Sequence, residues 1–202
     1  MPDAEPAMGR PIRSVAVFCG SREGNDPAFA VAAAELGAGL PHAGIRLVYG
    51  GGRIGLMGIV ADSVLAAGGE ALGVIPEFLT RREVMHRGVR DLVVTDSMHS
   101  RKQHMFEAAD AFVMLPGGLG TLDEIVEIIT WRQLGLHDKP VLLCDVAGSA
   151  RPILAAFEAA VAMGFARTDA MELFELVPGA AATLARLAHL QRGMVAGEPE
   201  RL

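Results

Sequence analysis

Several features that mark other protein classes are missing from this 202-residue chain. No segment runs 18 residues without charges or repeated polar breaks, so we expect no transmembrane helix and no membrane partner. The first residues, MPDAEPAMGRPIR, contain no apolar signal core, which argues against secretion by that route. The net charge of −6 argues against nucleic acid as the main partner.

Cysteine and lysine are also scarce. Cys19 and Cys144 each end an apolar run, and they are better explained as buried thiols than as a disulfide framework. Buried thiols fit a reducing compartment, and we predict a cytoplasmic location. The only lysines are Lys102 and Lys139. Because no glycine-lysine pair precedes a serine or threonine, the chain contains no P-loop.

Apolar, β-branched runs alternate with longer helical segments along the chain. This alternation predicts an α/β protein with a three-layer Rossmann-like fold, in which helices flank a parallel sheet. We expect one domain over residues 1–202, with disordered tails at about 1–12 and 193–202. A final helix is predicted at about 179–191. The predicted strands are residues 14–19, 45–49, 70–76, 91–95, 111–116, 139–145 and 171–177.

Three junctions between a predicted strand and the next helix are rich in glycine or charge. They are CGSREG after the first strand, YGGGRIGLMG after the second, and PGGLGT after the strand at 111–116. Ligands bind beyond the carboxyl ends of the strands in sheets of this kind. We therefore expect a binding site that includes Gly20, Ser21, Gly51 and Gly52 together with the PGGLGT loop.

The segment GGGRIG at 50–55 leaves an NAD(P)-dependent oxidoreductase open as an alternative. It matches the G-x-G-x-x-G pattern, follows a strand and opens a helix, and Glu77 at the end of the next strand could bind a ribose. However, the pattern lies on the second strand, and no Tyr-x-x-x-Lys pair is available because Tyr49 is the only tyrosine. A tight turn that needs positive φ explains the glycines equally well.

The segment PGGLGT at 116–121 is the better candidate for a phosphate site. Its glycines let backbone N–H groups approach an anion, the following helix presents its positive end, and Thr121 adds a hydroxyl. A helix dipole supplies about 0.3–2 kcal/mol, whereas millimolar binding needs about 4 kcal/mol, so we expect an arginine to assist.

Thr121 and Glu124 also fit a T-x-x-E capping box, in which the glutamate only returns a hydrogen bond to the backbone. A capping carboxylate within one turn of an anion site would repel the anion. We therefore favour a functional role for Glu124 over the capping alternative.

A predicted helix at 96–110 carries charges that oppose its dipole. His99, Arg101 and Lys102 lie in its first turns, and each costs about 0.3–1 kcal/mol there. We infer that Arg101 holds an anionic ligand, with a solvated basic patch or an ion pair to a neighbouring loop as the alternatives. His99 and His104 are five residues apart and do not share a helix face, so we expect no metal site.

In order and spacing, the segments VFCGS, LVYGGGRIGLMG, GVIP, SRK and PGGLGTLDE, followed by ITW, resemble the Lonely Guy family. The resemblance covers about residues 13–180. Members of this family are cytokinin riboside 5′-monophosphate phosphoribohydrolases. The resemblance implies a homodimeric hydrolase without a cofactor. Its substrate would be a nucleoside 5′-monophosphate such as AMP or a cytokinin nucleotide, and its products the free base and ribose 5-phosphate.

By the same resemblance, Arg101 and Glu124 match the catalytic arginine and glutamate of the family, and Lys102 matches a neighbour in the substrate site. Many such proteins have been labelled lysine decarboxylases, but only two lysines could form the Schiff base that pyridoxal phosphate requires. A nucleotide or cofactor carrier without turnover stays open as an alternative. The other positions that match substrate contacts are Glu83, Gly117, Gly118, Leu119, Gly120, Thr121 and Thr130.

Overall fold

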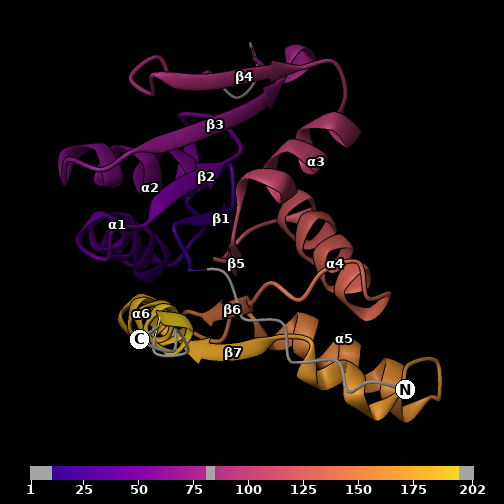
Figure 1. Cartoon of the computed structure of the whole chain (residues 1–202). Helices are drawn as coiled ribbons and strands as arrows, with labels where there is room; N and C mark the ends of the chain where they lie inside the picture. Colours follow the sequence, from indigo (N-terminus) through magenta and orange to yellow (C-terminus); the bar gives the residue numbers. More distant parts are fainter. Residues whose placement is uncertain (1–10, 81–84, 196–202) are drawn as a thin grey trace, which may run out of the picture.

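The computed structural model describes residues 11–80 and 85–195. Within these ranges seven strands form a sheet in which every neighbouring pair is parallel. Figure 1 shows them stacked in the order β4–β3–β2–β1–β5–β6–β7. The strands are β1 (Ser14–Phe18), β2 (Arg46–Tyr49), β3 (Ala71–Pro76), β4 (Asp91–Thr95), β5 (Ala111–Met114), β6 (Val141–Asp145) and β7 (Glu175–Pro178).

Helices cover both faces of this sheet. In Figure 1, α1, α2 and α6 lie on one face, and α3, α4 and α5 lie on the other. The predicted three-layer Rossmann-like fold is therefore confirmed. The helices are α1 (Pro27–His42), α2 (Gly55–Ala66), α3 (Met98–Ala108), α4 (Leu119–Gln133), α5 (Arg151–Ala162) and α6 (Gly179–Val195), with short 3₁₀ helices η1 (Glu77–Leu79) and η2 (Thr168–Glu172).

The sheet separates two apolar layers, and the central strand β1 supplies side chains to both. Val15 and Val17 are buried in the layer on the α1 and α2 side, whereas Ala16 and Phe18 are buried in the opposite layer. Successive residues of a strand point to opposite faces, so a strand covered on both sides must be apolar throughout. This is why the strands are visible in the sequence as continuous apolar runs.

The order in which successive strands join the sheet reverses at β1, and a crevice lies at this reversal. β1 pairs with β2 on one side and with β5 on the other. The loops that follow β1 and β5 run side by side, because Leu115 donates its N–H to the carbonyl of Phe18 (2.9 Å) and Gly20 donates to the carbonyl of Pro116 (3.0 Å). In open parallel sheets, ligands bind at this switch point.

One predicted strand begins at the wrong residue. The predicted strand at 171–177 begins too early, because η2 occupies Thr168–Glu172 and β7 starts at Glu175. Met171 and Leu173 are apolar because they pack against the buried layer under α5, not because they are in a strand.

The predicted tails are also too long. Ile12 is fully buried in the core, and α6 continues to residue 195. The rest of both tails lies outside the described residues.

Cys19 and Cys144 are buried thiols, as predicted, and burial raises the pKa of Cys144. Among the described residues, no helix is both long and apolar enough to cross a membrane.

Candidate functional site

Helix α4 begins directly at the glycine loop after β5. Its N-cap is Gly118, in an extended conformation, and this glycine has no side chain with which to cap the first turn. The first N–H groups of a helix have no partner inside the helix, so an uncapped start is ready to bind an anion. The loop is also tightly packed, because a Cβ atom on Gly117 would lie 2.1 Å from Oγ1 of Thr121. Only glycine fits at that position.

The capping alternative for Thr121 and Glu124 is wrong. Helix α4 starts at Leu119, so both residues lie inside it rather than at its cap. The helix begins earlier than the sequence indicates because Gly120 is accommodated within its first turn. Thr121 and Glu124 are 4% and 8% exposed, and both line the crevice. A buried carboxylate that serves no cap needs another explanation.

Arg101 lies opposite this carboxylate, on the first turns of α3. Ser97 caps α3 by accepting a hydrogen bond from the N–H of Ser100 (3.1 Å), which fixes where the helix starts. The guanidinium of Arg101 donates from Nε to the carbonyl of Val74 (3.1 Å) and from Nη2 to the carbonyl of Gly50 (3.4 Å). Nη2 also lies 3.6 Å from Oε1 of Glu124.

The Arg101–Glu124 pair is almost completely buried, with side chains 6% and 9% exposed. Removing two charges from water is costly, and their mutual attraction often fails to offset the cost. Buried ion pairs are therefore weak evidence for stability, whereas charged groups held in a cleft are characteristic of functional sites. This arrangement explains why α3 carries a cation that opposes its dipole, because Arg101 faces the carboxylate of Glu124 across the crevice.

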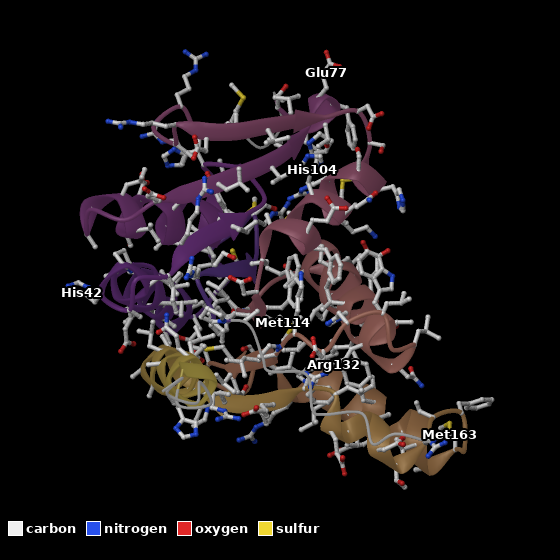
Figure 2. The ribbon with its side chains drawn as sticks, in the orientation of Figure 1. His42, Glu77, His104, Met114, Arg132 and Met163 are labelled. Carbon is white, nitrogen blue, oxygen red and sulfur yellow. The ribbon has the colours of Figure 1, made fainter. Side chains whose placement is uncertain are left out.

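The G-x-G-x-x-G segment has a packing explanation. A Cβ atom on Gly50 would lie 2.2 Å from Nη2 of Arg101, and one on Gly55 would lie 2.3 Å from the backbone nitrogen of Arg22. Gly55 also has a φ of +60°. Glu77, the residue considered for ribose binding, is exposed and lies at the outer edge of the molecule in Figure 2. The pattern therefore gives no independent support to a dinucleotide site.

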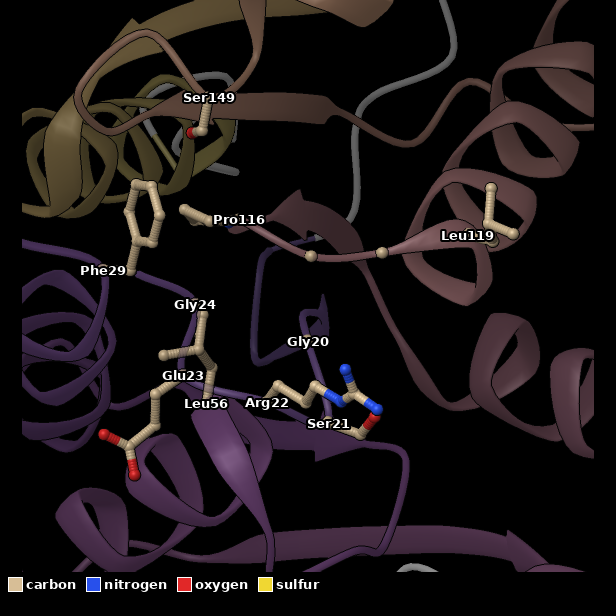
Figure 3. Close-up of a pocket in the computed structure, with 12 residues that line it drawn as sticks. Gly20, Ser21, Arg22, Glu23, Gly24, Phe29, Leu56, Pro116, Leu119 and Ser149 are labelled. Carbon is tan, nitrogen blue, oxygen red and sulfur yellow. The ribbon is translucent and has the colours of Figure 1, made fainter. Parts of the chain in front are cut away.

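The crevice consists of two connected pockets. The inner pocket, with a volume of about 160 Å³, contains the Arg101–Glu124 pair and the start of α4. The outer pocket, of about 660 Å³, is shown in Figure 3, with Phe29, Pro116 and Ser149 grouped at one end and Leu119 of α4 at the other. The residues shared by both pockets are Gly20, Ser21, Gly118 and Leu119.

The structure brings most of the predicted site residues together. Arg101, Glu124, Gly120 and Thr121 line the inner pocket, Gly117 lines the outer one, and the four shared residues were also predicted. Glu83 lies outside the described residues. The predicted residues that line neither pocket are Gly51, Gly52, Lys102 and Thr130.

Lys102 points to α4 rather than into the crevice. Its Nζ lies 2.9 Å from Glu127 and 3.2 Å from Asp123. Burial on its own lowers the pKa of Lys102, but the hydrogen bonds that its ammonium donates to Glu127 and Asp123 outweigh burial and raise the pKa. Lys102 therefore forms ion pairs with a neighbouring element instead of pointing into the crevice. Thr130 is exposed, and its hydroxyl donates to the carbonyl of Val126 (2.8 Å).

Some residues of the crevice were not predicted. Gly50, Met57 and Cys19 line the inner pocket, and Phe29 and Leu56 line the outer one. Gly50 and Cys19 adjoin glycines that were predicted, so the signal was present in the motifs. The apolar side chains carry no such signal, since nothing in the sequence distinguishes them from core residues.

Comparison with known proteins decides the family. The family described as "Possible lysine decarboxylase" matches residues 57–187. The cytokinin riboside 5′-monophosphate phosphoribohydrolase LOG of Oryza sativa subsp. japonica is 46% identical over 169 residues, which cover 84% of this chain and 70% of the relative. LOG1 of Arabidopsis thaliana, with the same activity in its name, is 44% identical over 84% of this chain and 79% of its own. The chain belongs to the Lonely Guy family.

Solved structures extend the likeness in fold to proteins of other function. The molybdenum cofactor carrier protein of Chlamydomonas reinhardtii superposes with a TM-score of 0.67 over 92% of this chain and 99% of its own. Its sequence identity is 20%, which shows a shared fold and nothing about ligand or activity.

The decarboxylase label of the family does not fit the lysines of this Lonely Guy protein. Lys102 is held by carboxylates of α4. Lys139 donates to the carbonyl of Phe106 (2.7 Å), and its Nζ lies 4.2 Å from the centre of the Phe106 ring. Neither lysine lines the two pockets of the crevice. Among the described residues, no group of three or more His, Cys, Asp or Glu side chains is placed to hold a metal ion.

Proposed function

We propose that the protein hydrolyses the N-glycosidic bond of a purine or cytokinin riboside 5′-monophosphate. The products are the free base and ribose 5-phosphate. The observation that carries the proposal is the buried Arg101–Glu124 pair beside the uncapped start of α4. Relatives with phosphoribohydrolase names that are about 45% identical over most of the chain support the same reaction.

The 5′-phosphate binds at the start of α4. The N–H groups of the first turn and the hydroxyl of Thr121 face the inner pocket and act as donors. A phosphate held here anchors the substrate away from the reacting bond. Binding energy from such a remote group orients the sugar and explains a preference for monophosphates over free nucleosides.

Glu124 then acts at the sugar. Cleavage of the bond between C1′ and the purine nitrogen leaves positive charge on the ribose, in an oxocarbenium-like transition state. A carboxylate in the pocket stabilises that charge and aligns water for addition to C1′. The bonding electrons leave with the base, which takes up a proton, and the water oxygen remains on the ribose 5-phosphate.

Arg101 fixes the substrate and the carboxylate. Its hydrogen bonds to the carbonyls of Val74 and Gly50 hold the guanidinium in one orientation. A planar guanidinium with several donors is suited to a phosphate or to a leaving group that gains electrons. In the same position its charge faces the carboxylate of Glu124.

We also propose that the protein is a homodimer joined through α4. The exposed face of α4 carries Leu119, Leu122 and Val126, which are 87%, 37% and 39% exposed. Thr130 follows on the same face at helical spacing. A partner subunit packed against this face would cover apolar surface at the mouth of the crevice. Thr130, which lines neither pocket of its own chain, could then contact a substrate bound in the partner subunit. Light scattering of the purified protein measures the mass directly.

A cytoplasmic location stays a prediction, supported by the two buried thiols.

The test is a chromatographic assay for free base. Purified protein is incubated with AMP and, separately, with isopentenyladenosine 5′-monophosphate, alongside the Glu124→Ala variant. Release from either substrate that is lost in the variant supports the proposal, and the ratio of the two rates identifies the preferred base. A folded wild-type protein that binds these nucleotides and releases no base contradicts hydrolysis and favours a carrier.

A further inference from the structure

A buried histidine lies beneath the glycine loop that holds Arg101. His86 is 3% exposed, and its Nε2 lies 3.0 Å from Oδ1 of Asp62 on α2. Its Nδ1 accepts a hydrogen bond from the N–H of Gly88 (3.2 Å). Because Nδ1 is an acceptor, the ring proton resides on Nε2 and points to the carboxylate. Both ring nitrogens are therefore engaged, and the imidazole is fixed in one tautomer and one orientation.

The backbone at residues 85 and 86 forms contacts with the glycine loop at residues 50–52. The N–H of His86 donates to the carbonyl of Gly51 (3.0 Å), and Gly52 forms an antiparallel bridge with Met85. On its other side Gly51 packs against β3, because a Cβ atom on it would lie 3.0 Å from Cβ of Ile75. The loop is held between β3 and the segment at residues 85–88.

The loop held by His86 also contacts Arg101, the proposed catalytic arginine. Gly50, next to Gly51, supplies one of the two carbonyls that receive Arg101, and Val74 of β3 supplies the other. Gly50 lies directly against the guanidinium, since a Cβ atom on it would be 2.2 Å from Nη2 of Arg101. The orientation of Arg101 therefore depends on where residues 50–52 lie, and residue 86 helps to determine that.

We propose that His86, fixed by Asp62, is a positioning residue that holds the Gly50–Gly52 loop and through it the guanidinium of Arg101. This inference rests on the proposed function, in which Arg101 contacts the substrate. Neither His86 nor Asp62 lines the inner or the outer pocket. The effect of replacing them is thus expected on the rate of the chemical step rather than on substrate capture.

The kinetic test compares His86→Ala with His86→Gln. The glutamine amide can donate to Asp62 as Nε2 does, whereas alanine removes both ring contacts. We expect His86→Ala to lower kcat at least tenfold with KM within about twofold, and His86→Gln to restore part of the loss. His42→Ala is the control, because the His42 ring bonds to the carbonyl of Ala38 on its own helix (2.8 Å) and lies on the far side of the sheet from α3.

A double-mutant cycle separates positioning from a general loss of stability. In an Arg101→Lys background, lysine cannot make both fixed contacts, so His86→Ala should cost less than twofold further. If His86→Ala instead caused a general structural defect, it would lower kcat by the same factor in both backgrounds. Equal losses in the two backgrounds, or an unchanged kcat in folded His86→Ala protein, overturn the proposal.

One readout does not depend on turnover. In ¹⁵N NMR spectra, the Nε–H of Arg101, assigned by its absence in Arg101→Lys, should exchange slowly with solvent in the wild type. It should lose most of that protection in His86→Ala and keep it in His42→Ala. If the wild type releases no base, the hydrolase assignment fails, and this measurement still decides the positioning role. An unaltered Arg101 signal in His86→Ala rejects it.

Discussion

Nη2 of Arg101 lies 3.6 Å from Oε1 of Glu124, and each side chain is more than nine-tenths buried. The two residues come from the first turns of α3 and α4, on opposite sides of the crevice beyond β1 and β5. Neither residue caps its helix, and the pair lies beside the uncapped start of α4. This relationship places a carboxylate and a fixed cation within one small pocket, next to the helix start at which we propose that the phosphate binds.

Arg101→Lys is expected to lower kcat by about 10²-fold or more, the scale associated with loss of one fixed electrostatic contact. Lysine retains the charge, but a compact ammonium cannot reach the carbonyls of Val74 and Gly50 in the geometry of the guanidinium. Steady-state base release from AMP checks this. A lysine variant with wild-type kcat would show that charge alone suffices.

Gly50→Ala should reduce activity although no functional group is lost. The added Cβ would lie 2.2 Å from Nη2 of Arg101, so the guanidinium must move away from Glu124. We expect kcat to fall at least tenfold. Gly39→Ala is a matched control, since its Cβ would meet the flexible side chain of Leu184 at 2.2 Å, remote from the crevice. A similar loss of kcat in both variants would argue against a specific effect.

Thr121→Val should reduce the contribution of the 5′-phosphate to catalytic efficiency. Valine keeps the shape but removes the hydroxyl of Thr121, a residue that lines the inner pocket. We expect kcat/KM for AMP to fall about tenfold, close to the loss of one hydrogen bond to a charged group at about 1.5 kcal/mol. Thr121→Ser should retain most of the activity. We expect adenosine, which has no phosphate, to react slowly with the wild type and to be affected little by this change. An equal loss on adenosine would contradict a phosphate contact.

A salt bridge between β7 and α6 predicts a pH-dependent stability term. Arg186 donates two hydrogen bonds to Glu175, at 2.6 and 2.7 Å, and these lower the pKa of the carboxyl below 4.5. A depressed pKa stabilises the fold above the unfolded value and loses that contribution as the pH falls through the folded value. The pair is partly exposed, so its contribution is about 0.5 kcal/mol.

Urea unfolding of Arg186→Ala and wild-type protein tests this term. Arg186→Ala should be less stable than the wild type by about that amount at pH 7. The difference should shrink towards zero near pH 3. A difference that stays constant between the two pH values would mean that packing, and not charge, accounts for the effect.

The sequence predicted the architecture because the strands are covered on both faces. Apolar runs such as that of β1 show where a strand lies, and the glycine junctions show which edge of the sheet binds a ligand. The edge strand β7 was harder to place. Glu175 and Leu176 at its start are exposed, so β7 does not begin with a continuous apolar run. The apolar residues before them belong to or follow the 3₁₀ helix η2, which packs under α5.

The site was predicted in its composition but not in its geometry. The paired motif identified Arg101 and Glu124, yet the backbone carbonyls that orient Arg101 come from β2 and β3 and carry no side-chain signal. Lys102 was predicted to contact substrate, but its partners Asp123 and Glu127 lie one helical turn apart on α4, and only the tertiary structure brings them to it. The apolar walls of the outer pocket have the composition of ordinary core residues.

The most direct test of the account is base release by Glu124→Gln, measured beside AMP binding. Glutamine preserves the size of the side chain and removes only its charge. We predict that kcat falls by at least about 10³-fold, within the range of carboxylate catalysis, while the affinity for AMP changes by less than about fivefold. A variant that releases base at the wild-type rate would show that the carboxylate next to Arg101 does not act at the sugar.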